Sequence, residues 1–258
     1  MKSKTYGKVL WLYFVILFSF PAQPVFAETD QLLVAIAQWP PWKIIDQGKF
    51  GGIDVEILRE IGKRLGITFK FVACPWKRCV EMAKIGDVDM ITSFGKTTER
   101  EAFVYYLGPP YRTGKVVFYK EKDKPFSVRK YEDLYKFKIG VLKGSAYFDP
   151  FDSDPQLDKV KVAMDYQLPH MLFSRRIDLI AGWEISMDYF IAREGFRENF
   201  ETVPYGVSGI SKYMAMSKKS KALKLIPELS ALIRHMVENK EIDRIINALL
   251  KRTEPRSP

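Results

Sequence analysis

The chain has 258 residues, of which 47% are hydrophobic and 28% charged, and its formal net charge is +10. This composition is typical of a globular protein. The basic residues are scattered among acids and form no long block, so the charge indicates a solvated basic surface and we expect no nucleic-acid partner.

A cleavable leader is predicted at the N-terminus. Lysines in the first eight residues precede an apolar run, Val9–Phe20, and a polar stretch then ends at Ala27. A basic start, an apolar run and a small residue at the end are what leader peptidases require. The run falls short of the roughly 20 residues that span a membrane, which disfavours an anchor. We therefore expect cleavage after Ala27, removal of residues 1–27 and export to the periplasm.

Short strands and helices alternate in the first half of the chain. Strands are expected at residues 32–37, 67–72, 88–93 and 115–119, and helices at residues 54–65 and 76–85. The first of these helices carries Val55, Leu58 and Ile61 on one apolar stripe. The alternation predicts a largely parallel sheet with helices on both faces.

Two tryptophans follow the first expected strand, in the stretch Trp39-Pro40-Pro41-Trp42. In an open α/β sheet, ligands bind at the carboxyl ends of the strands. Trp39 and Trp42 on a stiff Pro-Pro turn therefore predict a preorganised aromatic wall, with one ring in the cleft and one packed inside.

The only cysteines, Cys74 and Cys79, flank the start of the second expected helix. In an oxidising compartment they can pair if the backbone turns between them, which Pro75 at a helix start permits. A metal site or a redox pair is the alternative, but four intervening residues do not match C-x-x-C. The sequence favours a disulfide.

A donor-rich loop follows the strand at 88–93. It contains Ser93, Gly95 and Arg100. A hydroxyl, a glycine that exposes backbone N–H groups and a guanidinium together suit a carboxylate, which arginine binds with two parallel hydrogen bonds.

A second α/β series begins after a charged, turn-rich stretch at residues 120–125. Strands are expected at 139–142, 160–164, 178–181 and 212–216, with a helix at 167–175. Two further helices are expected in the tail, residues 221–251, with a break at 238–240. This order predicts a second lobe inserted into the first, with the tail packing back on the first lobe.

No motif for a metal, a phosphate or a nucleophilic serine is visible. His170 and His235 are isolated in the sequence, and the pattern Gly-x-Ser-x-Gly is absent. We therefore expect no metal or other cofactor, and a hydrolase is unsupported.

Taken together, these motifs resemble the bacterial extracellular solute-binding proteins of family 3, the polar amino-acid receptors of ABC importers. The resemblance covers residues 32–250 and rests on the order of loose motifs: Trp39-Pro40-Pro41-Trp42, Gly86-Asp87-Val88-Asp89, Thr97-Thr98-Glu99-Arg100 and Pro110-Tyr111.

The resemblance implies a type II periplasmic-binding-protein-like fold with two mostly parallel sheets and two hinge crossings, near 119–122 and 206–211. Lobe 1 is then residues 28–119 plus 212–252, lobe 2 is residues 120–211, and residues 253–258 are a tail. The protein is expected to be a monomer that delivers its solute to an ABC permease in the inner membrane.

Site residues follow from the same resemblance. Trp39 matches the stacking aromatic, Ser93 and the backbone of Gly95 match carboxylate donors, and Arg100 matches the carboxylate-pairing arginine. Residues of the second lobe and of the second helix complete the expected ligand site: Ser145, Tyr147 and Trp76.

The sequence departs from the family pattern in the second lobe. The acid that holds the ligand's ammonium aligns with Trp183, and Glu184 is adjacent. Either Glu184 takes that role, or the Trp183 ring holds a cation, or the ligand has no α-amine. Gly95 and Ala146 also stand where many members have a hydroxyl.

The first functional hypothesis is capture of a small carboxylate-bearing solute between two lobes. An enzyme similar to cyclohexadienyl or arogenate dehydratases is the second, with Glu184 as the candidate general acid. The third is sensing, in which the closed protein binds a chemoreceptor or histidine kinase.

Overall fold

The computed structural model describes residues 31–253. The predicted leader with its cleavage site after Ala27 lies outside the described residues, as does the tail beyond residue 253. Thr253 itself ends the last helix rather than beginning the tail. Within residues 31–253, no helix is both long and apolar enough to cross a membrane.

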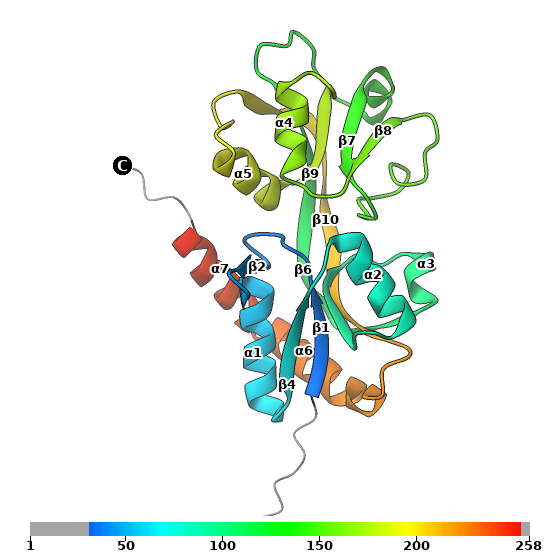
Figure 1. The fold of residues 1–258 in the computed structure, drawn as a ribbon, viewed down its shortest axis with the longest axis vertical. Coiled ribbons are helices and arrows are strands. Elements are labelled where there is room, and N and C mark those ends of the chain that lie inside the picture. Colours follow the sequence, from blue (N-terminus) through cyan, green and yellow to red (C-terminus); the bar gives the residue numbers. More distant parts are fainter. Residues whose placement is uncertain (1–30, 254–258) are drawn as a thin grey trace, which may run out of the picture.

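The first lobe is built on three parallel strands. Strand β1 (Gln31–Ile36) lies between β4 (Thr68–Ala73) and β5 (Met90–Phe94). Helices α1 (Ile53–Leu65) and α2 (Trp76–Ile85) are the crossovers between these strands (Figure 1). Alternate residues of β1 pack into different hydrophobic clusters, one with α1 and one with α2, so the strand is covered on both faces as its apolar sequence predicts.

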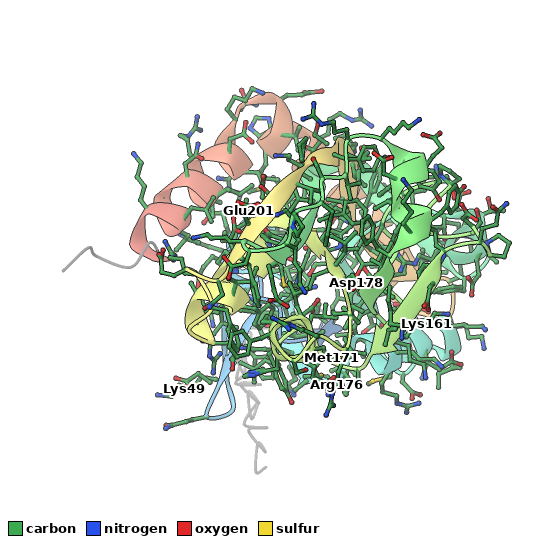
Figure 2. All side chains as sticks on the ribbon, turned by 90° about the horizontal axis from the view of Figure 1, so that it is seen from above. Lys49, Lys161, Met171, Arg176, Asp178 and Glu201 are labelled. Carbon is green, nitrogen blue, oxygen red and sulfur yellow. A yellow bond between two sulfur atoms is a disulfide. The ribbon has the colours of Figure 1, made fainter. Side chains whose placement is uncertain are left out.

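Helix α1 begins at a close backbone approach. Gly52 has φ 95°, and a Cβ at this position would lie 2.6 Å from the carbonyl oxygen of Trp42. Only glycine fits such a turn. The hairpin of β2 (Ile44–Asp46) and β3 (Lys49–Gly51) precedes it and projects from the side of the molecule, with Lys49 exposed (Figure 2).

The second lobe repeats the parallel arrangement. Strand β7 (Lys138–Leu142) pairs in parallel with both β8 (Asp158–Val162) and β9 (Leu179–Trp183). Its other elements are helices α4 (Gln167–Phe173) and α5 (Glu184–Arg193) and the 3-10 helix η1 (Tyr131–Lys136). Both lobes therefore have the expected α/β architecture.

Two long strands join the lobes. Strands β6 (Val104–Glu121) and β10 (Phe200–Ser217) are antiparallel partners along their whole length and run from one lobe to the other (Figure 1). β10 also pairs with β5, and β6 with β9, so eight strands form one continuous sheet. The short strands expected at 115–119 and 212–216 are parts of these two.

The pairing of β6 with its neighbours shows where the chain first crosses between the lobes. Val116–Tyr119 pair with β9 of the second lobe, whereas Val104–Leu107 pair with the part of β10 that lies beside β5. The crossing therefore lies between Leu107 and Val116, earlier than the expected 119–122. That expectation came from the family resemblance, whereas in this chain β6 passes through the crossing as one continuous strand. The second crossing, expected at 206–211, lies opposite residues 113–117 of β6.

The C-terminal helices return to the first lobe. Helices α6 (Ile226–Glu238) and α7 (Glu241–Thr253) follow the short 3-10 helix η2 (Leu223–Leu225), and the expected break at 238–240 is confirmed. Leu229, Ile233 and Ile242 pack into the same cluster as α1. The tail thus packs on lobe 1, as predicted.

Candidate functional site

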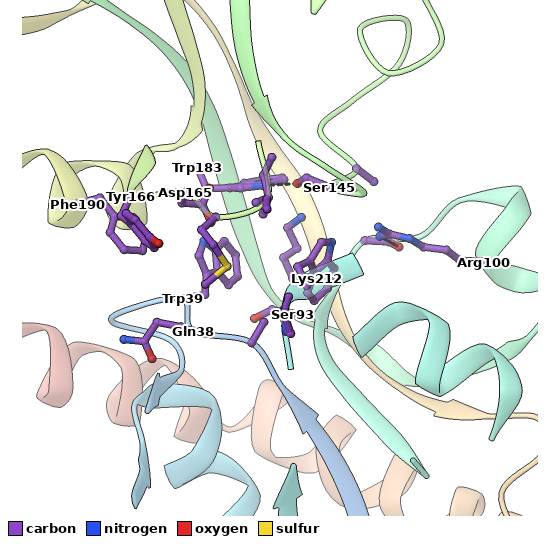
Figure 3. Close-up of a pocket in the computed structure, with 18 residues that line it drawn as sticks. Gln38, Trp39, Ser93, Arg100, Ser145, Asp165, Tyr166, Trp183, Phe190 and Lys212 are labelled. Atoms are coloured by element: carbon purple, nitrogen blue, oxygen red, sulfur yellow. Dashed lines mark hydrogen bonds between the residues drawn. The ribbon is translucent and has the colours of Figure 1, made fainter. Parts of the chain in front are cut away.

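A cavity lies between the two lobes (Figure 3). It measures about 50 Å³, which is room for only a few water molecules. Its walls come from both lobes: Ala37, Gln38, Trp39, Pro75, Trp76, Ser93, Gly95 and Arg100 from the first, and Leu142, Ser145, Ala146, Ala163, Met164, Asp165, Tyr166, Trp183 and Phe190 from the second, with Lys212 on β10. A solute bound there would contact both lobes.

Two tryptophans from opposite lobes form an aromatic corner of the cavity. The edge-to-face contact of Trp39 and Trp183 has a centroid distance of 6.4 Å and an angle of 83°. Trp183 is further stacked on Tyr147, at 6.0 Å and 7°. Such ring pairs are rigid and apolar, so this side of the cavity suits the hydrocarbon part of a solute.

Trp42 lies outside this cavity. It is 4% exposed, and its ring packs 3.6 Å from the guanidinium carbon of Arg112. It borders a separate hollow of about 180 Å³. Of the two tryptophans on the Pro-Pro turn, Trp39 lines the cavity and Trp42 packs inside, so the geometry does not support Trp42 as a contact of a ligand in this cavity.

The loop after β5 supplies Ser93 to the cavity wall, but its hydroxyl is already engaged. Ser93 Oγ donates to Asp54 Oδ2 at 2.6 Å and accepts from Arg112 Nη2 at 2.8 Å. Tyr111 donates to the other oxygen of Asp54 at 2.7 Å. This buried network fixes the loop, and it leaves the Ser93 proton committed to Asp54 rather than free for a ligand.

The Asp54 network also contains a buried lysine. Lys43 Nζ lies 4.0 Å from Asp54 Oδ2. Burial lowers the pKa of Lys43 to about 8, although the Asp54 carboxylate opposes the shift. Within residues 31–253, Asp54 is thus the one acid of a network that contains two cations, Lys43 and Arg112, and it neutralises them only in part.

Arg100 lies at the edge of the cavity, between the lobes. Its Nη1 donates to the carbonyl of Gly95 at 2.9 Å and its Nη2 to the carbonyl of Gly144, in the other lobe, at 3.0 Å. Trp76 Nε1 donates to the same Gly144 carbonyl at 2.8 Å. Two donors of the first lobe thus meet one acceptor of the second, and these hydrogen bonds stabilise the closed arrangement.

The turn after β7 brings Ser145 to the cavity, where its Oγ accepts a long hydrogen bond of 3.4 Å from Trp183 Nε1. Tyr147 lies behind this turn. It is buried, its hydroxyl accepts from the backbone N–H of Leu142 at 2.9 Å, and it borders a wider hollow of about 870 Å³ that shares Arg100 with the cavity. Tyr147 therefore positions the turn and Trp183 rather than lining the cavity.

Glu184 does not line the cavity. It begins α5 directly after Trp183, and the turn from strand to helix directs its side chain elsewhere. Its carboxylate forms an ion pair with Lys115 at 2.6 Å. The expectation that Glu184 contacts the ligand is not supported by this geometry, because adjacent residues at the strand end face different directions.

Two charged residues of the cavity were not predicted from the sequence. Lys212, on β10, is 3% exposed, and its Nζ lies 3.3 Å from the centre of the Trp183 ring. Burial lowers the pKa of Lys212 well below its usual value, and the neighbouring cations Arg112, Arg100 and Lys43 lower it further. No motif marks this residue, because a lysine in a strand next to a hinge usually faces solvent.

Asp165 is the other unpredicted residue. It lies in the turn that follows β8, and burial raises its pKa to about 7. Its position in the sequence could have indicated a site residue, because Asp165 lies beyond the carboxyl end of a strand, as Trp39 and Arg100 do.

The predicted disulfide is present between Cys74 and Cys79, with a Cα–Cα distance of 5.4 Å. It joins the end of β4 to the first turn of α2, the helix that begins at Trp76. Among residues 31–253, no group of three or more His, Cys, Asp or Glu side chains is placed so that it could bind a metal ion.

Solved structures with this fold include solute-binding proteins and a sensor. An amino acid ABC transporter substrate-binding protein from Streptococcus pneumoniae, bound to L-arginine, has a TM-score of 0.72 at 22% identity and covers 86% of this chain and 94% of its own. A histidine kinase sensor domain with similarity to periplasmic binding proteins has a TM-score of 0.72 at 21% identity and covers 86% and 96%. At such identities the likeness establishes the two-lobe fold alone.

Sequence relatives point to one family. A "Probable histidine-binding protein" from Campylobacter jejuni subsp. jejuni serotype O:2 is 28% identical over 107 residues, which are 42% of this chain and 41% of that protein. The match thus spans less than half of that relative. Residues 32–251 match the family described as "Bacterial extracellular solute-binding proteins, family 3". Because this match spans most of the chain and agrees with the motifs and the fold, the protein belongs to the bacterial extracellular solute-binding proteins of family 3.

Proposed function

We propose that this protein captures a small carboxylate-bearing solute, an amino acid or a related acid, in the cavity between its lobes and delivers it to an ABC importer. The observation that carries this proposal is the pairing of buried Arg100 and Lys212 with an aromatic corner in one interlobe cavity. Buried cations favour a carboxylate, and the rings suit apolar atoms. The names of similar proteins, which specify histidine and arginine as ligands, agree with an amino-acid-like solute.

Binding between the lobes gives the solute a way to control closure. The interlobe hydrogen bonds of Trp76 and Arg100 to Gly144 exist only when the lobes are together. A solute that contacts both lobes adds to them and shifts the population toward the closed form. A permease can then distinguish loaded from empty protein by shape.

The arrangement favours affinity over turnover. The only candidate general acid named from the sequence, Glu184, is held in an ion pair with Lys115 away from the cavity. Asp165 does line the cavity, but no nucleophile and base lie together there. For a dehydratase-like reaction the general acid would therefore have to be Asp165 rather than Glu184, since Asp165 is the acid that lines the cavity within residues 31–253.

Periplasmic location, a monomeric state and a transient complex with an inner-membrane permease complete the proposal. Family membership supports an extracytoplasmic site of action. A second role is sensing, favoured by the similarity of the fold to a histidine kinase sensor domain. In that case the closed form contacts a receptor instead of, or in addition to, a permease.

Arg100→Ala tests the proposal. Thermal shift and calorimetry of the wild-type protein against amino acids and organic acids are expected to identify a carboxylate ligand, and the variant is expected to lose at least about tenfold in affinity. Arg78→Ala removes a comparable but exposed arginine and serves as the control. Wild-type affinity in Arg100→Ala would contradict the carboxylate assignment.

A further inference from the structure

Lys212 is a buried cation without an acidic partner. Its side chain is almost completely buried, and its nearest described contact is the face of the Trp183 ring, 3.3 Å from Nζ. Within residues 31–253 no carboxylate is close enough to form an ion pair with it and no acceptor takes a hydrogen bond from it. An isolated buried ammonium is costly unless an anion neutralises it. Figure 3 shows the side chain pointing into the cavity rather than away from it.

Charges around Lys212 add to this excess rather than balance it. Arg112, Arg100 and Lys43 lower the pKa of Lys212, and Asp152 is the acid that opposes this effect. Two of these cations already donate hydrogen bonds to other groups. Arg112 donates to Ser93 of the Asp54 network, and Arg100 donates to two backbone carbonyls. Asp54 itself accepts from Thr92, Ser93 and Tyr111 and faces Lys43. The cavity by itself therefore disfavours the charged form of Lys212, and an anionic solute that reaches it is the group that would favour that form.

Arg100 and Lys212 approach the same point above Gly95. A Cβ built on Gly95 would lie 3.4 Å from Arg100 Nη1 and 3.6 Å from Lys212 Nζ. Because Gly95 has no side chain, a ligand atom can approach its backbone closely between these two cations. An anionic group placed there contacts both cations at once, which is the geometry of a charge-assisted anion site.

We propose that Lys212 is a specificity-determining residue, which together with Arg100 makes the cavity select solutes of net negative charge, such as dicarboxylates and acidic amino acids. This inference rests on the proposed function and narrows its solute class. Among the residues that line the cavity, the charged groups are Arg100, Lys212 and Asp165. Two cations and one acid complement a solute with two carboxylates and one ammonium, or a dicarboxylate when Asp165 is protonated.

The same charges disfavour a cationic solute. Arginine and lysine carry two positive groups and one carboxylate, so one positive group would lie near Lys212 or Arg100 without an acid to pair with. Like charges at short range in a poorly solvated site repel strongly. The cavity therefore differs in specificity from the L-arginine-bound protein that shares its fold.

Calorimetric titration with four probes tests the inference: L-glutamate, succinate, L-glutamine and L-arginine. Glutamate and glutamine have nearly the same shape and differ in charge. The wild-type protein is expected to bind glutamate or succinate at least about tenfold more tightly than glutamine and arginine. Lys212→Met is expected to reduce this preference to about threefold or less. Lys120→Met, which removes another buried lysine, one paired with Glu201 outside the cavity, is expected to retain it.

Folding of the variant is checked by its melting temperature, which is expected to equal or exceed that of the wild type because a buried unpaired charge is removed. Tighter binding of glutamine or arginine than of both acids overturns this inference and leaves the proposed function intact. An unchanged preference in Lys212→Met overturns it as well. Absence of binding to all four probes contradicts the inference, and absence of binding to the wider set of amino acids and organic acids contradicts the proposed function.

Discussion

The carboxyl group of Asp165 lies half-buried on the second-lobe wall of the cavity, and burial raises its pKa to about 7. In the unfolded chain its pKa is near 3.8. Between these values the folded protein keeps a proton that the unfolded chain releases. The free energy of unfolding therefore falls as the pH rises from 3.8 to about 7. Above that range the folded state bears the full free-energy cost of the ionised, buried carboxylate.

Asp165→Asn removes this cost. At pH 8 the variant is expected to exceed the wild type by about 2–4 kcal/mol in free energy of unfolding, and the difference is expected to shrink as the pH approaches 4. Urea denaturation at several pH values measures it. The exposed Asp123→Asn is the matched control. A difference that does not vary with pH would show that Asp165 titrates normally.

Gly95→Ala tests the space between the two cations. The added methyl group would contact Arg100 and Lys212 at ordinary distances of 3.4 and 3.6 Å, so the fold is expected to tolerate it. The methyl group would block the close approach of an anion to the Gly95 backbone between the two cations, and affinity for the solute is expected to fall about tenfold or more. Calorimetry checks this, with Gly51→Ala as the control because a Cβ at Gly51 meets nothing within 4 Å. Unchanged affinity in Gly95→Ala would place the anion elsewhere.

At the scale of single residues, the sequence indicated which loops border the cavity better than it indicated which side chains of those loops point into it. Most of the expected ligand-binding residues do line the cavity: Trp39, Trp76, Ser93, Gly95, Arg100, Ser145 and Trp183. Their role in binding stays a prediction. Trp42, Tyr147 and Glu184 do not line it, because each is next to or near a lining residue on a turn that directs it elsewhere. Lys212 was missed because its neighbours in the fold, such as the Trp183 ring and the Arg112 cation, are distant in sequence.

At the scale of the elements, the Cys74–Cys79 disulfide fixes how α2 leaves β4. Helix α2 begins at Trp76, whose Nε1 bonds Gly144, so the disulfide also holds a cavity residue. Closing so short a loop restricts the unfolded chain by about 2 kcal/mol.

Reduction, or the variant Cys74→Ala/Cys79→Ala, is therefore expected to lower the free energy of unfolding by about 2 kcal/mol. Urea denaturation with and without reductant measures the effect, and reductant is expected to leave the double variant unchanged. Equal stability of the oxidised and reduced wild type would contradict a stabilising role for this bond.

Helices and parallel strands could be predicted from the sequence because their apolar periodicity is local. The expected helix at 76–85 and the break at 238–240 match the structure. The long strands β6 and β10 could not be predicted, because their length comes from pairing with each other and with β5 and β9 across the two lobes. The position of the first crossing was missed for the same reason.

At the scale of the whole molecule, closure depends on a few interlobe hydrogen bonds. Trp76→Phe keeps a smaller aromatic ring at this position and removes the Nε1 donor to Gly144. The lost hydrogen bond is worth about 1 kcal/mol, so affinity is expected to fall about fivefold while the free energy of unfolding changes little. Small-angle scattering without solute is expected to show a larger radius of gyration than for the wild type.

Tyr135→Phe is the control for this variant. It removes a hydroxyl hydrogen bond to Asp154 that lies within the second lobe, so neither affinity nor the radius of gyration is expected to change. An effect of Tyr135→Phe as large as that of Trp76→Phe would mean that closure does not depend on the Gly144 contact.

The central claim is that the interlobe cavity captures a carboxylate-bearing solute. The most direct measurement is competitive capture: the protein is incubated with a defined mixture of amino acids, organic acids and uncharged solutes, desalted and denatured, and the released molecules are identified by mass spectrometry. We expect the wild type to release a carboxylate-bearing solute in an amount comparable to the protein, and Arg100→Ala to release little. Release of solutes without a carboxylate, or equal release from the variant, would contradict the claim.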